Sequence, residues 1–166
     1  MPASDQGVTR GRYMLIPRVL IFITRGACFL LLKGAPDKRL WANKYNGIGG
    51  HIEAGEDILS AARRELLEET GLKADLWLCG TVVVDTGENP GVGIFIFTGE
   101  CPEGDQEQST EGRLEWISAS DVLKLPTVED LPILLDRIRR MRPGDPPFSA
   151  RSYYNECQNM IIEFSN

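Results

Sequence analysis

The stretch GIGGHIEAGEDILSAARRELLEETGL, residues 47–72, constrains this chain more than any other. Its second half repeats apolar residues at the three-and-four spacing that places them on one buried helix face: Leu59, Ala62 and Leu66. Gly71 is the residue type that most often ends a helix. The pattern therefore predicts an amphipathic helix that follows the glycines and stops at Gly71.

The polar face of this helix is acidic. Its glutamates recur three and four positions apart: Glu65, Glu68 and Glu69. Carboxylates at this spacing lie on one patch of helix surface, within reach of a shared partner. Arg64 can pair with Glu68 one turn away, but nothing nearby in the sequence neutralises all three acids. Because like charges at this spacing destabilise a bare helix, the pattern indicates a bound divalent cation, and oxygen ligands favour Mg²⁺ or Mn²⁺.

The glycines ahead of the helix indicate what such a cation would do. They let the backbone approach closely and point its amide or carbonyl groups into a site: Gly47, Gly49, Gly50 and Gly55. Magnesium typically keeps coordination positions for water and phosphate oxygens. A spare carboxylate can then deprotonate a water molecule for in-line attack on phosphorus. Together these features predict chemistry on a polyphosphate.

Length and charge narrow the remaining classes. The chain has 166 residues, of which 42% are apolar and 25% charged, as expected for one soluble globular domain. We expect residues 1–13 to be a flexible N-terminal tail and residues 14–166 to form a single domain. The net charge of −6 argues against a nucleic-acid polymer or an anionic membrane as the partner. The sequence shows no signal-peptide core and its scattered cysteines form no C-x-x-C pair, so we expect a cytoplasmic protein with reduced, largely buried thiols.

Apolar patterning predicts the other elements. Five runs read as strands, at residues 19–24, 28–32, 75–85, 92–99 and 114–117, and short turns join the first two pairs into hairpins. Residues 34–50 are predicted to form a loop, in which Trp41 and Tyr45 either cap the core or contact a ligand.

The C-terminal part is expected to begin with a brief helix over residues 118–125. A longer helix after Thr127 carries an apolar stripe: Leu131, Leu134, Leu135, Ile138 and Met141. The Pro-rich residues 142–147 end it, and residues 159–164 are expected to be a strand or a packed tail. The role of residues 143–166 stays open.

From Gly50 to Leu72 the chain resembles the Nudix box at every defining position: Gly50, Glu56, Arg64, Glu65, Leu66, Glu68, Glu69, Gly71 and Leu72. Seven fixed identities and two apolar positions would coincide by composition in fewer than about one in 10⁸ windows. The resemblance implies an α/β protein, a Nudix-type α/β/α sandwich with a mixed β-sheet. It also implies Mg²⁺-dependent hydrolysis of a nucleoside diphosphate linked to another group.

The resemblance also assigns roles to residues of the box and of one later loop. The metal-binding acids would be Glu65, Glu68 and Glu69, with the Gly50 carbonyl as a further ligand. Arg64 would orient them, and Glu56 would brace the loop or join the metal network. Similar enzymes supply one more catalytic, metal-binding acid from a late loop, where Glu111 lies here. That loop has other acids, and an acid there is as often solvated: Glu103, Asp105 and Glu107.

The segment WANKYNGIGGHIEAGE is similar to the MutT-like branch of the family, which hydrolyses oxidised purine nucleoside triphosphates such as 8-oxo-dGTP and releases pyrophosphate. By this resemblance Asn46 would contact the base, although it can equally shape the turn, and Glu129 with Asp130 would contact the base from a late loop. His51 stands where a lysine is common, and it either donates to a phosphate or is a surface residue. Three further cations are candidates for phosphate contact: Arg18, Lys33 and Lys44.

Two alternatives stay open beside this prediction. One is a broader nucleoside diphosphate hydrolase that acts on nucleotide sugars or other triphosphates. The other is a nucleotide sensor without turnover, although such a domain is expected to lose one or more box acids, and this chain keeps all of them. In each case the partner is a small nucleotide, and the protein is a monomer or a homodimer.

Overall fold

The computed structural model describes residues 2–9, 11–107 and 109–165. Within them, eight strands form one sheet that carries two α-helices. The elements follow the chain in this order: η1 (Ala3–Gln6), β1 (Leu15–Arg25), β2 (Cys28–Gly34), β3 (Tyr45–Asn46), α1 (Ile58–Thr70), β4 (Trp77–Val84), β5 (Gly91–Glu100), β6 (Gly112–Ser118), η2 (Val122–Lys124), α2 (Leu131–Ile138), β7 (Phe148–Tyr154) and β8 (Met160–Phe164).

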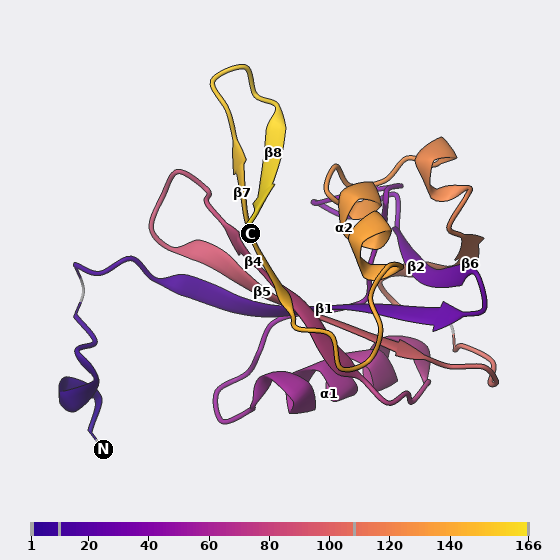
Figure 1. Cartoon of the computed structure of the whole chain (residues 1–166), viewed down its shortest axis with the longest axis horizontal. Helices are drawn as coiled ribbons and strands as arrows, with labels where there is room; N and C mark the ends of the chain where they lie inside the picture. Colours follow the sequence, from indigo (N-terminus) through magenta and orange to yellow (C-terminus); the bar gives the residue numbers. More distant parts are fainter. Residues whose placement is uncertain (1, 10, 108, 166) are drawn as a thin grey trace.

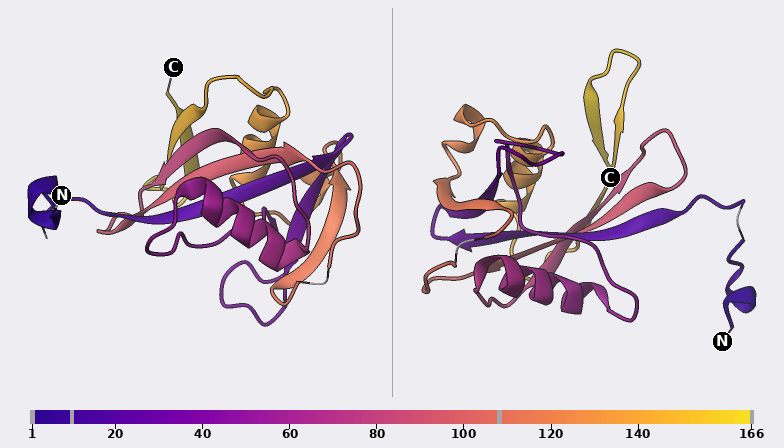
Figure 2. Two further views of the ribbon diagram at one scale, coloured as in Figure 1. Left: turned by 90° about the horizontal axis from the view of Figure 1, so that it is seen from below. Right: turned by 180° about the vertical axis from the view of Figure 1, so that it is seen from behind.

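The sheet is mixed because two of its pairings are parallel. Its strand order is β3-β2-β1-β5-β4-β7-β8, and β6 also pairs with β2. β1 runs parallel to β5 and β4 parallel to β7, whereas the other pairs are antiparallel. In Figure 1 α1 lies on one side of the sheet and α2 on the other, and Figure 2 shows the same layers from two further directions. The predicted α/β/α sandwich with a mixed β-sheet is confirmed.

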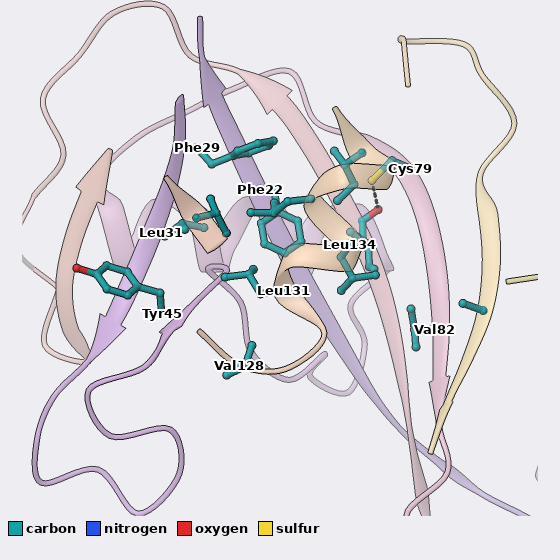
Figure 3. Packing of buried hydrophobic residues seen from close by; sticks show 14 of the residues in the cluster. Phe22, Phe29, Leu31, Tyr45, Cys79, Val82, Val128, Leu131 and Leu134 are labelled. Carbon is teal, nitrogen blue, oxygen red and sulfur yellow. Dashed lines mark hydrogen bonds between the residues drawn. The ribbon is translucent and has the colours of Figure 1, made fainter. Parts of the chain in front are cut away.

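Alternation along β1 supplies two apolar cores, one on each face of the sheet. Successive side chains of a strand point to opposite faces. Val19 and Ile21 are buried in the core that includes Leu66 of α1. Phe22 is buried in the other core, which includes Leu134 of α2 (Figure 3). The helix that carries the acidic face is therefore anchored to β1 by its apolar face, as the sequence pattern predicts.

The glycine loop ahead of α1 is inserted into the sheet between β1 and β2. These two strands pair only near their shared turn. Farther along, β3 lies beside β2, and residues 48–51 form bridges to β1. The N–H of Val19 donates to the carbonyl of Gly50 at 3.0 Å. The N–H of Ile21 donates to the carbonyl of Ile48 at 2.7 Å. The loop is therefore held by the hydrogen-bonding groups of a core strand.

Most predicted elements are present with shifted bounds. Both predicted hairpins are confirmed as β1–β2 and β4–β5, and the strand predicted at 114–117 forms the middle of β6. The brief helix predicted over residues 118–125 is the shorter η2. α2 ends at Ile138, so Met141 of the predicted stripe lies beyond the helix, where it still packs against the α2-side core.

The sequence does not predict β7. In its sequence, FSARSYY, the buried positions after Phe148 are the small Ala150 and the polar Ser152, so the apolar alternation typical of a strand is weak. The strand forms because it pairs in parallel with β4 and buries Phe148 and Ala150. β8 follows as the strand expected at residues 159–164, and the β7–β8 hairpin projects from the body of the molecule in Figure 1.

The N-terminal segment and the cysteines complete the description. The tail predicted over residues 1–13 contains η1, while residues 1 and 10 lie outside the described part. Its last residues contact the β4–β5 turn, because Asn89 Nδ2 donates to the carbonyl of Arg12 at 3.0 Å.

All four cysteines are free, but Cys157 in the β7–β8 turn is exposed, which departs from the predicted burial. No helix in the described ranges is long and apolar enough to cross a membrane.

We expect Leu134→Ala to lower the free energy of unfolding by about 2–5 kcal/mol, because it opens a cavity beneath α2. Leu134 is 1% exposed, whereas its neighbour Ile133 is 41% exposed. Ile133→Ala on the same helix should therefore cost less than about 1 kcal/mol. Urea unfolding of both variants compares them directly, and equal losses would contradict the packing of α2 on the sheet.

Candidate active site

Helix α1 begins and ends through interactions that its own sequence supplies. The carboxylate of Asp57 accepts hydrogen bonds from the N–H groups of Leu59 and Ser60, at 2.9 and 3.0 Å. These two donors would otherwise lack a partner at the start of the helix. At the other end, Gly71 has a φ of 70° and its N–H donates to the carbonyl of Leu67 at 2.9 Å. The predicted helix and its glycine stop are confirmed.

Arg64 is the centre of the polar network on α1. Its guanidinium donates to both carboxylate oxygens of Glu56, at 2.7 and 2.9 Å. It also donates to Glu65 at 2.8 Å, to Glu68 at 3.2 Å and to the carbonyl of His51 at 3.1 Å. The bonds to Glu56 and Glu65 raise the pKa of Arg64, and the bond from Arg64 holds the pKa of Glu56 below its ordinary value. Arg64 thus joins the loop before the helix to the acids on the helix.

Gly50 lies directly against the carboxylate of Glu65. A Cβ atom at position 50 would lie 2.5 Å from Glu65 Oε1, closer than real contacts allow. The Gly50 carbonyl, a predicted metal ligand, accepts the N–H of Val19. A carbonyl oxygen has two lone pairs, so this bond leaves one for a further partner. A side chain at position 50 would therefore force the carboxylate of Glu65 to move.

Glu69 has the most unusual surroundings of the three helix acids. Its side chain is 9% exposed, and its buried Oε2 has no hydrogen-bond partner among the described residues. The backbone N–H of Gly49 donates to this carboxylate. Burial, followed by the negative charges of Glu111 and Glu65, raises the pKa of Glu69 to about 8. A buried carboxylate with an unpaired oxygen beside two further acids is what a divalent cation would satisfy, so these residues fit such an ion.

The carboxylates of the three helix acids do not converge as they stand. Among the residues that the structure describes, no group of three Asp, Glu, His or Cys side chains is arranged to hold a metal ion. Glu65 and Glu68 contact Arg64, and Glu69 contacts Gly49. The side chain of Glu68 is 59% exposed, so it is the acid most open to solvent. Joint binding of one ion therefore requires Glu65 and Glu68 to use their second oxygens or to turn from Arg64.

The late acidic loop brings Glu111 to this face of the helix. The backbone carbonyl of Glu111 accepts the N–H of Ala35 at 3.2 Å, and its carboxylate pairs with Lys38 at 2.5 Å. Its charge contributes to the raised pKa of Glu69, so the two carboxylates lie within electrostatic range. Glu107 of the same loop lies instead against Gly71, at the end of α1. The sequence pattern did not single out Lys38, since several cations share its loop.

Backbone pairing brings the predicted base-contacting residues together. Tyr45 exchanges two hydrogen bonds with residues 126–128, at 2.8 and 3.0 Å. Asn46 therefore lies beside the segment that leads into Glu129 and Asp130. Asn46 does shape the turn, because its Oδ1 accepts the N–H of Gly47 at 2.8 Å. That bond uses the amide oxygen and leaves the amide N–H groups for another partner.

Two groups beside this segment have altered acidity. Burial, followed by the charge of Glu129, raises the pKa of Asp130. Tyr154 at the end of β7 lies near the same pair, and burial together with the charges of Glu129 and Asp130 raises its pKa. No sequence pattern points to Tyr154, because it belongs to β7, the strand that the sequence does not predict.

The predicted phosphate-binding side chains have other neighbours than the helix acids in the described residues. Arg18 Nε lies 3.2 Å from His51 Nε2, so these two side chains form one pair beside the glycine loop. The ammonium of Lys33 lies 5.5 Å from the ring centre of Tyr45, and Lys44 is exposed. Within the described residues, none of the four is paired with an acid of α1.

An open pocket of about 810 Å³ lies elsewhere, between the β1–β2 turn, the start of β4 and the end of α2. Its lining includes Cys28, Trp77 and Met141. None of the predicted site residues lines it. The candidate active site is therefore defined by its acids and backbone groups, not by this cavity.

We expect Glu69→Gln to stabilise the metal-free protein at pH 8. The raised pKa means that the folded state binds the proton of Glu69 more tightly than the unfolded state, so the group favours folding below about pH 4.5 and opposes it increasingly as the pH rises to about 8. Gln keeps the size of the side chain without the charge. In EDTA, the variant should melt several degrees above the wild type at pH 8 and close to it at pH 4.5.

Added Mn²⁺ should then raise the melting temperature of the wild type more than that of the variant, because Glu69 contributes to the ion's binding. Glu156→Gln, in the exposed β7–β8 turn, makes the same chemical change away from the site and should follow the wild type. A Glu69→Gln variant less stable than the wild type at pH 8 in EDTA would contradict the cost assigned to this buried carboxylate.

Comparison with known proteins relates this chain to a family. Residues 14–138 match the model of the NUDIX domain. An oxidized purine nucleoside triphosphate hydrolase of Danio rerio is 39% identical over 98 residues, covering 58% of this chain and 61% of that protein. The protein of the same name from Mus musculus is 32% identical over 94 residues, covering 55% and 60%. The matched stretches thus span less than two thirds of each curated relative.

Solved structures agree on the fold. The MutT protein of Bacillus halodurans superposes with a TM-score of 0.73 at 24% identity, covering 90% of this chain and 97% of that chain. The MutT protein of Methanosarcina mazei Go1 gives 0.67 at 25% identity, covering 78% and 96%. The NUDIX model matches residues 14–138, well over half of the chain, and the mixed sheet has the same fold as these structures, so the chain belongs to the NUDIX family.

Proposed function

We propose that this protein hydrolyses a nucleoside triphosphate to the monophosphate and pyrophosphate, with Mg²⁺ or Mn²⁺, by attack of water at phosphorus. The observation that carries the proposal is the buried Oε2 of Glu69, which has no hydrogen-bond partner in the described part of the chain and lies within electrostatic range of Glu65 and Glu111. Such a carboxylate is costly unless a cation binds it. Membership of the NUDIX family supports the same chemistry.

The acids and Arg64 have separate roles in the proposed reaction at phosphorus: metal binding, positioning and proton acceptance. A bound divalent cation would polarise a phosphoryl oxygen and lower the pKa of a water molecule. We assign its binding to Glu65, Glu69 and Glu111, with the Gly50 carbonyl as a further ligand. Arg64 holds Glu65 in position. Glu68 is more than half exposed, so a water molecule reaches its carboxylate from solvent, and we assign it as the proton acceptor.

The residues beside β3 suit recognition of a purine base. The free amide N–H groups of Asn46 are hydrogen-bond donors. The raised pKa of Asp130 makes its protonated form easier to reach than that of an ordinary aspartate, and that form could donate a hydrogen bond to the base. Oxidation of guanine at C8 adds a carbonyl oxygen that needs such a donor. The names of the two curated relatives support oxidised purine triphosphates, such as 8-oxo-dGTP, as the substrate class.

The free thiols support a proposed compartment. All four cysteines are free, although two of them are at least partly accessible: Cys28 and Cys157. Accessible thiols stay reduced in the cytosol, and we propose that the protein works there.

We expect the wild type with Mg²⁺ to release pyrophosphate from a nucleoside triphosphate, and Glu68→Gln to lower kcat by about 100-fold or more, because it loses the proton acceptor. The exposed position of Glu68 lets the fold survive, which circular dichroism verifies. Glu156→Gln is the matched control and should keep the wild-type rate. Undiminished kcat in Glu68→Gln would remove this assignment. Tight nucleotide binding without product in the wild type would instead favour a sensor.

We expect kcat/KM to be higher for 8-oxo-dGTP than for dGTP, and Asn46→Ala to reduce that ratio by about tenfold while changing turnover of dGTP less. The amide donors act on the base and not on the phosphates, so the loss falls on selectivity. A panel of oxidised and normal purine triphosphates and nucleotide sugars measures this. Equal values across the triphosphates, or a preference for nucleotide sugars, would replace the proposed substrate with the broader class.

A further inference from the structure

The loop of residues 35–43 lies next to the acidic site through backbone contacts. At its neck, the N–H of Gly34 donates to the carbonyl of Lys44 at 3.0 Å. The register of β2 and β6 places Gly34 opposite Gly112, directly after Glu111. The N–H of Ala35 then donates to the carbonyl of Glu111. Backbone hydrogen bonds alone therefore position the loop relative to Glu111.

Lys38 extends from this loop to the carboxylate of Glu111. Its ammonium lies 2.5 Å from Glu111 Oε2, and both side chains are partly exposed. A second acid, Glu69, lies within electrostatic range of the same ammonium. Arg64 contacts the other box acids but neither of these two in the described residues. Lys38 therefore supplies positive charge to the acids that Arg64 does not reach.

The charge of the surrounding segment suits an anionic ligand. Residues 33–44 contain one acid, Asp37, and four cations: Lys33, Lys38, Arg39 and Lys44. This concentration of positive charge is unusual in a chain with a net charge of −6. A basic segment against an acidic site attracts a polyphosphate to the boundary between them.

We propose that Lys38 holds Glu111 in the metal-free protein and becomes a phosphate-binding residue when the site is loaded. A divalent cation that binds Glu111 displaces the ammonium, and the freed ammonium binds a phosphate oxygen of the nucleotide. Lysine suits this exchange because its ammonium is a compact charge on a flexible stem, without the fixed two-point geometry of arginine. The second step rests on the proposed function.

The displacement step is tested without nucleotide. Mn²⁺ bound to the free protein is measured by electron paramagnetic resonance for the wild type and Lys38→Met. Removing the competing ammonium should tighten Mn²⁺ binding by about threefold or more, since an exposed ion pair is worth up to about 1 kcal/mol. Arg39→Met removes the same charge from the same loop, but among the described residues Arg39 forms no ion pair, so it should change the affinity less. Unchanged or weaker Mn²⁺ binding by Lys38→Met, or equal effects of both variants, would overturn the proposal.

The phosphate-binding step is tested by steady-state kinetics at saturating Mg²⁺. Lys38→Met should raise KM for a nucleoside triphosphate by about fivefold, with kcat within about twofold of the wild type, because the contact is made before and during the reaction alike. Where the wild type shows no turnover, the proposed function fails, and the Kd of a non-hydrolysable triphosphate is measured in its place. An unchanged KM or Kd would overturn the phosphate role of Lys38 alone.

Discussion

The hydrogen bonding of residues 48–50 along β1 is the constraint on which the rest of the site depends. The segment lies outside the named strands, yet its backbone is hydrogen-bonded to β1 at Ile48 and Gly50. This puts the N–H of Gly49 at the carboxylate of Glu69 and the bare Cα of Gly50 against Glu65. The same core strand, β1, packs against the apolar face of α1. Both the loop and the helix are thus positioned by β1.

In this arrangement, two contributions to the free energy of folding have opposite signs: burial of the apolar face of α1 and burial of a carboxylate on its other face. Burial of Leu66 and Ala62 stabilises α1 on the sheet, and its capping residues stabilise both ends. Burial of the Glu69 carboxylate acts in the opposite direction, and no hydrogen bond reaches one of its oxygens in the described residues. The apolar face of the helix therefore offsets the cost of its acidic face. Arg64 limits that cost by sharing its charge among Glu56, Glu65 and Glu68.

Local signals made the central part of the molecule predictable. The helix, its glycine stop and the two hairpins follow from periodicity and turn residues within short windows. As predicted, α1 follows the glycines and ends just before Gly71. The sequence could not show which partner each carboxylate takes, because the contacts of Glu69 with Gly49 and of Glu111 with Lys38 join residues far apart in the chain. β7 was missed for the same reason, since its pairing with β4 and not its composition makes it a strand. The proximity of Asn46 to residues 129–130 follows from the non-local pairing of Tyr45 with residues 126–128.

Because β7 pairs in parallel with β4, the acidic residues of α1 and the surroundings of Glu129 and Asp130 depend on different parts of the chain. The acids of α1 and the glycine loop are complete within residues 47–72, and the family match ends at residue 138, before β7 begins. Tyr154 lies near Glu129 and Asp130 because β7, which carries it, pairs with β4. Heritable changes in β7 can therefore alter the surroundings of Glu129 and Asp130 without touching the acids of α1. A lineage that carries this architecture can vary those surroundings while the acidic face of α1 stays constant.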